Sequence, residues 1–238
     1  MKVYSIATIP SDLALRTNIA EPLEYAPVYQ ARPGMKMPII IYRNDRPELV
    51  SAMWGLRSSA SYNSIHMSRV LKSRPWNILI RTHRCAVPAN CVIVEKNNQA
   101  FLIRLPQHRL FLMGGVVQQR KDDYHFTLLE TESADLLAPI TESMPVFIHN
   151  DRIQKWLGQK KDEDDYSMEL DSIFRFADKA GNNYFDYFKI DPKVLDPKAN
   201  NRELLVPIDL SNEQYRLRDK QIMAVSFEKE RANRRNSK

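Results

Sequence analysis

The sequence has little of what marks several specialised protein classes. It contains 2 cysteines and 6 glycines in 238 residues, which excludes a disulfide scaffold and a collagen-like or glycine-rich chain. No window approaches the roughly 20 uncharged apolar residues of a membrane-spanning helix. The first apolar stretch is too short and too polar for a signal peptide. We therefore expect a cytoplasmic protein.

The chain also lacks the spacings of the common catalytic and metal sites. Cys85 and Cys91 have no CxxC partner, and no HxxxH or HxH group lies beside them. A structural zinc site needs about four ligands, so we expect no metal and interpret both thiols as buried, small apolar groups. The GxGxxG, GxxxxGK[ST], HExxH and GxSxG motifs are missing too, and we expect no cofactor.

The composition is that of an ordinary globular domain. Hydrophobic residues make up 43% of the chain and charged residues 27%, enough for a core and a solvated surface. A β-rich chain of this length can form one domain. We expect a single, monomeric domain over residues 1–210, followed by a basic C-terminal extension over residues 211–238 that frays at its end.

Apolar alternation and turn residues predict strands separated by short helices. Strands are expected at residues 37–43, 48–56, 85–96, 99–105, 110–119 and 124–133, and helices at residues 12–18, 73–80, 132–137, 150–157 and 168–179. The pairs Asn97-Asn98 and Gly114-Gly115 are turn or bulge signals between successive strands. The predicted fold class is α+β with a mainly antiparallel sheet.

Positive charge is concentrated in one stretch. Residues 49–94 contain no Asp or Glu, but they contain six cationic side chains: Arg57, Arg69, Lys72, Arg74, Arg81 and Arg84. Trp54, Tyr62 and Trp76 lie among them. Cations interleaved with aromatic rings are typical of a groove that holds a phosphate backbone and stacks bases. The alternative is a solvated face whose acids come from elsewhere in the fold.

Five short segments carry a family resemblance in their order along the chain. They are MWGL at 53–56, RCAVPANC at 84–91, FTLLETESADLLAPITESMPVFI at 126–148, WL at 156–157 and FDYFKIDPKVLDPKANNRELLVPI at 185–208. Together they resemble the SRAP family, the SOS response-associated peptidase or abasic-site-processing domain, over about residues 1–208. The resemblance implies a compact β-rich fold with a closed barrel-like sheet and flanking helices.

The resemblance also implies a chemistry in the DNA damage response. Family members hold single-stranded DNA in a basic groove and trap the aldehyde of an abasic site on an N-terminal cysteine, which removal of Met1 would expose. An α-amine is partly neutral at physiological pH and attacks the aldehyde, and the adjacent thiol closes the adduct to a ring. A Glu, an Asn and a His near that amine position it and move protons.

This sequence departs from the family at each of those catalytic positions. Lys2 stands in place of the cysteine, Ile65 in place of the Asn, Val94 in place of the Glu and Thr141 in place of the His. Glu95 is one step along the strand from Val94, and hence on its opposite face. We therefore expect neither the covalent DNA crosslink nor a peptidase activity. A Schiff base on the amine of Met1 or Lys2 is the remaining catalytic alternative.

Binding of single-stranded DNA is the function that this pattern favours. Trp54 matches a family aromatic residue that lies against the nucleic acid, although it suits a core position equally well, and Thr131 matches a family threonine. Met67 replaces a DNA-binding Arg of the family. The expected binding residues are Trp54, Arg57, Arg69, Lys72, Arg74, Arg81, Arg84 and Thr131. The alternative is a protein-interaction or structural module with no nucleic-acid role.

Overall fold

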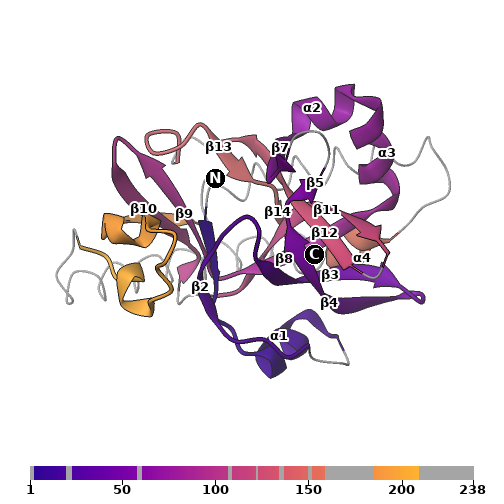
Figure 1. The fold of residues 1–238 in the computed structure, drawn as a ribbon, viewed down its shortest axis with the longest axis horizontal. Helices are drawn as coiled ribbons and strands as arrows, with labels where there is room; N and C mark the ends of the chain where they lie inside the picture. The colour runs from indigo at the N-terminus through magenta and orange to yellow at the C-terminus, as the bar shows by residue number, and fades with distance from the viewer. Residues whose placement is uncertain are drawn as a thin grey trace, which may run out of the picture.

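The structure, a computed structural model, describes residues 3–19, 23–57, 61–106, 109–121, 123–133, 137–149, 152–158 and 185–208. These residues form an α+β fold in which short helices surround mainly antiparallel sheets (Figure 1). The fold class predicted from the sequence is confirmed. No helix among the described residues is long and apolar enough to cross a membrane.

The strands are β1 (Val3–Ile6), β2 (Val28–Ala31), β3 (Lys36–Arg43), β4 (Arg46–Trp54), β5 (Leu56–Arg57), β6 (Ser61–Tyr62), β7 (Ser64–His66), β8 (Arg84–Ala89), β9 (Cys91–Lys96), β10 (Gln99–Arg104), β11 (Phe111–Arg120), β12 (Asp123–Glu132), β13 (Ser143–Pro145), β14 (Phe147–Ile148) and β15 (Asp186–Ile190). The helices are α1 (Pro10–Thr17), α2 (Met67–Lys72), α3 (Arg74–Thr82) and α4 (Ile153–Leu157), with 3-10 turns η3 (Pro192–Leu195) and η4 (Arg202–Leu205).

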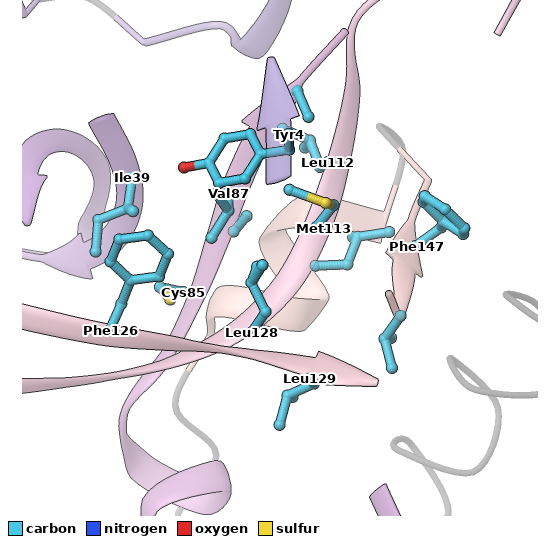
Figure 2. Packing of buried hydrophobic residues seen from close by; sticks show 14 of the residues in the cluster. Tyr4, Ile39, Cys85, Val87, Leu112, Met113, Phe126, Leu128, Leu129 and Phe147 are labelled. Carbon is cyan, nitrogen blue, oxygen red and sulfur yellow. The ribbon is translucent and has the colours of Figure 1, made fainter. Parts of the chain in front are cut away.

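The larger sheet closes into a ring around the main core. Its strands follow the order β12-β4-β3-β8-β11, and a further pairing of β11 with β12 closes the ring. All these pairings are antiparallel except β4 with β12. Figure 2 shows Phe126 and Leu128 of β12 on the side that faces Tyr4, while Leu129 lies on the other side. Alternation along β12 thus selects which side chains fill the ring.

The smaller sheet has the order β15-β10-β9-β1-β2 and buries both of its faces. Tyr4 and Val92 on one face join the main core. Val3 and Ile93 on the other face join a second apolar cluster, which Val194 of η3 covers. A strand that is buried on both faces has a continuous run of apolar residues in its sequence, as residues 91–94 do.

The segment 191–208 is a clasp that ties the two edges of the smaller sheet together. At the β2 edge, Gln30 and Asn201 exchange two hydrogen bonds of 3.0 and 2.8 Å. At the β15 edge, the amide of Ile208 donates to the carbonyl of Lys189 over 2.9 Å. Asp191 caps η3 and Asn201 caps η4. The DPK and N-ELL segments of the family-like ending are therefore capping and turn residues.

Most predicted elements form, with a few corrections. The predicted strand 85–96 is two strands, β8 and β9, because Asn90 interrupts it and its Oδ1 accepts from the amides of Ala7 and Thr8. Helix α4 spans only Ile153–Leu157 of the predicted 150–157. β12 continues to Glu132, where a helix was expected to begin. The helix predicted at 168–179 and the C-terminal extension lie outside the described residues.

The two turn signals have different outcomes. Asn97 and Asn98 have left-handed φ values of 52° and 59° and join β9 to β10, as predicted. Gly114 and Gly115 form no turn, because both lie within β11. A Cβ on Gly115 would lie 2.8 Å from Cys85 Sγ and 2.8 Å from the Thr127 carbonyl. Gly115 thus allows β8 and β12 to pack closely on either side of β11.

Candidate functional site

The first described strand, β1, pairs with β9 beside Val94, the position expected for the family's acid. Val3 pairs with Ile93 at the start of β1, and Val94 is the next residue along β9. Val94 is 3% exposed and belongs to the main core, whereas Glu95 is exposed to solvent. The prediction that Glu95 lies on the opposite face is confirmed. Met1 and Lys2 lie outside the described residues.

The position assigned to the family's Asn is also apolar and buried. Ile65 in β7 pairs with Leu129 of β12 in a parallel register, and both side chains are in the core. Met67, which begins α2, is 6% exposed. Both side chains are therefore apolar and buried, and neither offers a polar group to a ligand.

Thr141 is part of a polar cluster at the end of β12. Its hydroxyl donates to the carbonyl of Ser143 over 2.7 Å. The hydroxyl of Ser143 donates in turn to Oε2 of Glu130 over 3.0 Å. Glu130 is 8% exposed and pairs in register with His66 of β7 on one side and Pro145 of β13 on the other. A carboxylate therefore lies close to Thr141 and to Ile65, two of the positions at which the sequence predicts that the family's polar groups are replaced.

Glu130 was not singled out in the sequence, although a signal for it was present. It continues the alternation of Phe126 and Leu128 along β12, which places it on the same face of the strand as these two core residues. The turn that carries Thr141 is also tied to β9, because Lys96 Nζ donates to the carbonyl of Pro139 over 2.7 Å. The ends of β7, β9, β12 and β13 thus gather at one end of the ring.

Helices α2 and α3 carry the cationic part of the acid-free stretch. Arg69, Lys72 and Arg74 are exposed. Arg81 is half-buried, and its Nε donates to Asn77 Oδ1 over 2.8 Å. Among the described residues, Lys72 and Arg74 form no ion pair. We call the exposed side of residues 68–82 the α2–α3 surface. Its cations are presented to solvent, as a phosphate-binding surface requires.

The two tryptophans of the same stretch are core residues. Trp54 is 1% exposed, and its indole N–H donates to the Asn63 carbonyl over 2.7 Å. Its ring lies 5.0 Å from that of Tyr4 and stacks on that of Phe126 at 6.2 Å, centroid to centroid. Trp76 is 9% exposed. Of the two interpretations of Trp54, its burial fits the core anchor and leaves no ring face for a base.

Arg84 is likewise directed inward. Its Nη1 donates to the carbonyls of Ile80 and Arg81 at the end of α3, both over 2.9 Å. Its Nε and Nη2 donate to the carbonyls of Trp156 and Gly158 at the end of α4. With 6% exposure, the guanidinium caps two helices rather than meeting a phosphate. Nucleic-acid contact by Arg84, expected from the sequence, conflicts with this burial.

The remaining predicted binding residues are less exposed or less fully described. Thr131 is half-buried in β12 and pairs with Met144 of β13. Arg57 lies in β5, and its side chain is outside the described part of the chain, as is that of Tyr62. Of the eight predicted residues, Arg69, Lys72 and Arg74 are therefore the ones whose described side chains are exposed.

Both cysteines are buried and poorly nucleophilic. Burial raises the pKa of the Cys91 thiol from 9.0 to about 12 and raises that of Cys85 further. The thiolate is the reactive form of cysteine, so neither side chain can stand in for an N-terminal thiol. Within the described ranges, no three His, Cys, Asp or Glu side chains are grouped to hold a metal ion.

A cavity of about 530 Å³ lies where β4 ends beside β12. Trp54, Asn63, Asp123 and His125 are among the residues that line it. Asp123 forms an exposed ion pair with Lys36 at 3.2 Å, and His125 Nδ1 lies 3.3 Å from the Gly55 carbonyl. These groups already have protein partners, so the cavity has fewer polar groups for a ligand than its lining suggests.

The family assignment comes from comparison with known proteins. The family model of the SOS response associated peptidase (SRAP) matches residues 3–196. The chain belongs to the SRAP family. It is 23% identical over 200 residues to the abasic site processing proteins YoaM and YoqW of Bacillus subtilis, covering 76% of this chain and 86% and 87% of those proteins.

Solved structures share the SRAP fold. A protein from Bacteroides thetaiotaomicron superposes with a TM-score of 0.67 at 16% identity, covering 87% of this chain and 99% of that one. A phage-related protein from Bordetella bronchiseptica gives a TM-score of 0.65 at 16% identity, and the match covers 80% of this chain and 94% of that one. At this identity the likeness concerns the fold alone, so the function of this SRAP chain has to be argued from its own residues.

Proposed function

We propose that this SRAP protein binds single-stranded DNA through the α2–α3 surface and does not form the covalent crosslink of its family. The observation that carries the proposal is the exposure of Arg69, Lys72 and Arg74 within a stretch that contains no acidic residue. Cations of this kind release counterions from a phosphate backbone when they bind it. Two relatives are named abasic site processing proteins, which makes damaged DNA the ligand to test.

The absence of covalent chemistry is proposed from the residues at the catalytic positions. Val94 and Ile65 are apolar and buried, and Lys2 has no sulfur to close a ring on an aldehyde adduct. The two cysteines of the chain are Cys85 and Cys91, and burial keeps both thiols protonated. The amine, acid and thiol that a stable adduct needs are therefore not assembled from the family's positions.

Binding is tested by fluorescence anisotropy with a labelled single-stranded oligonucleotide over a series of salt concentrations. The wild-type affinity should fall steeply with salt. The double variant Lys72→Glu/Arg74→Glu should bind at least about tenfold more weakly, because two phosphate contacts become repulsive. Arg43→Glu is the matched control, since Arg43 is exposed but lies on the β3–β4 hairpin and pairs with Glu48. Equal binding by both variants, or no binding at low salt, would contradict the proposal.

The covalent reaction is tested separately with an oligonucleotide that contains an abasic site. After incubation and denaturing electrophoresis, no DNA band should be retarded by attached protein. A retarded band that survives denaturation would show that a residue such as the Met1 amine or Lys2 has taken over the reaction. The variant Lys2→Ala would then distinguish the side chain from the α-amine.

A protein-interaction module is the second candidate function. It is favoured by the inward orientation of Trp54 and Arg84, two residues that the sequence assigned to nucleic acid. The anisotropy measurement separates the two candidates, because a structural module would show no affinity for the oligonucleotide even at low salt.

A further inference from the structure

Two aliphatic side chains are exposed among the cations of the α2–α3 surface. Leu71 is 49% exposed and Ile78 is 53% exposed. The side-chain amide of Asn77 donates to the Leu71 carbonyl over 3.4 Å, so the end of α2 lies against the first turns of α3. Leu71 and Ile78 therefore lie on two neighbouring helices that contact each other.

Cations and aliphatic groups alternate along that surface. Arg74, Ile78 and Arg81 follow one another at spacings of four and three residues, so they share one side of α3. A spacing of four residues corresponds to a rise of about 6 Å along the helix. Leu71 precedes Arg74 by three residues at the junction of the two helices. A ligand that runs along α3 thus meets an aliphatic and a cationic group in turn.

This alternation suits an unpaired strand better than a duplex. Phosphates are presented on the outside of both forms and would meet the cations in either case. The faces of the bases are apolar and become available to side chains only when the bases are not stacked within a helix. Packing Leu71 and Ile78 against those faces would remove apolar surface of both partners from water.

We propose that Leu71 and Ile78 contact the bases of an unpaired strand and make the α2–α3 surface prefer single-stranded over double-stranded nucleic acid. The inference rests on the proposed function and adds the residues that determine its selectivity. Arg69, Lys72 and Arg74 supply affinity for either form, and the two aliphatic side chains supply the difference between them.

The test uses labelled oligothymidylate and a blunt duplex of the same length, with anisotropy measured over a salt series. Leu71→Gln and Ile78→Gln should each weaken binding of oligothymidylate about fivefold to tenfold, as expected when a half-exposed aliphatic group no longer becomes buried. Duplex binding should not change. The slope of log affinity against log salt should also stay the same, because no phosphate contact is lost.

Two further variants make the result specific. Leu15→Gln on α1 is the matched control, since Leu15 is 81% exposed on a different helix, and it should change neither affinity. Arg74→Gln should weaken binding of both nucleic acids and reduce the single-strand salt slope by about 0.7. Thermal melting by circular dichroism should be the same for all four variants, because each replaced side chain is exposed to solvent.

The outcomes separate this inference from the proposed function. If the wild type binds neither nucleic acid, the proposed function fails. If it binds both forms equally, or if the two Gln variants bind oligothymidylate as the wild type does, only the selectivity inference is overturned. Binding of polyglutamate that both Gln variants lose, while oligothymidylate binding is retained, would assign the two side chains to an acidic protein partner and would likewise overturn it.

Discussion

Arg84 holds the ends of two helices with a single guanidinium group. The carbonyls at the end of α3 and those at the end of α4 all accept hydrogen bonds from it. The last carbonyls of a helix have no partner within the helix, and buried ones are costly to leave unsatisfied. This side chain therefore contributes to the fold and, together with the hydrogen bond from the Trp156 indole to the Cys85 carbonyl, holds α4 against β8.

Arg84→Met should lower the free energy of unfolding by about 3 kcal/mol, because it leaves several buried carbonyls without a donor. Lys72→Met, which replaces an exposed cation of the same basic segment, should change it by less than about 0.5 kcal/mol. Urea denaturation followed by tryptophan fluorescence measures both. Equal losses in the two variants would show that the hydrogen bonds of Arg84 do not carry the stability assigned to them.

The buried thiol of Cys91 makes the free energy of unfolding depend on pH in the alkaline range. Burial raises the pKa of its thiol from 9.0 to about 12 in the folded protein, whereas the thiol of the unfolded chain ionises near its ordinary value. Above about pH 9 the folded state therefore binds more protons than the unfolded state, and the stability contributed by the protonated thiol is lost as pH rises toward 12.

The unfolding free energy of the wild type should fall with pH above about 9, with each buried thiol contributing a slope that approaches about 1.4 kcal/mol per pH unit. Cys91→Ala should reduce that slope by the share of one thiol while also lowering stability at neutral pH through the cavity it creates. Urea titrations between about pH 8 and pH 10 measure the slope. An unchanged slope in Cys91→Ala would contradict the assignment.

Two hairpins of the molecule share one turn chemistry. Asn97 and Asn98 join β9 to β10, and Asn44 and Asp45 join β3 to β4, all four with φ between 52° and 60°. Two consecutive left-handed residues define the type I′ turn, whose twist matches that of the paired strands. The same chemistry thus sets the register in both sheets.

Asn98→Gly should leave the stability unchanged or raise it by about 0.5 kcal/mol, because glycine adopts a left-handed φ without a steric penalty. Asn98→Val should lower it by about 1 to 2 kcal/mol, because a β-branched residue is strained there. Thermal melting of the two variants gives the comparison. If valine were tolerated as well as glycine, the left-handed turn would not be what fixes this hairpin.

Elements also differ in how far the sequence alone determines them. The ring strands β3, β4, β11 and β12 follow from local alternation and turn residues, and helix α3 follows from the proline at its start. These elements were predicted to within a few residues. The division of residues 84–96 into β8 and β9 was not predicted. It depends on the Asn90 side chain, which accepts hydrogen bonds from the backbone amides of the distant residues Ala7 and Thr8. Contacts of this kind have no local signal.

At the scale of the whole molecule, the clasp of residues 191–208 closes the smaller sheet. Arg32 follows β2 and donates from Nη2 to the carbonyls of Val194 and Asp196 over 2.6 and 2.7 Å. The clasp is thereby connected to the end of β2. It also covers the second apolar cluster, which would otherwise face water.

Arg32→Leu should loosen the clasp and lower the free energy of unfolding by about 1 to 3 kcal/mol, since two carbonyls lose a charged donor. Hydrogen exchange should quicken at η3 and along β15 more than in the ring strands, because the clasp opens as a local unit. Arg46→Leu, an exposed cation on the β3–β4 hairpin, serves as the control. Uniform exchange across both sheets would contradict a local role.

The sequence by itself determined the fold class and the family, because these depend on residue identity and on alternation along the strands. Only the tertiary structure decided which members of the acid-free stretch face solvent. Trp54 and Arg84 turn inward, while Lys72 and Arg74 remain exposed. Their burial depends on strands and helices far away in the chain, and no local pattern of charge or aromatic residues records those distant contacts.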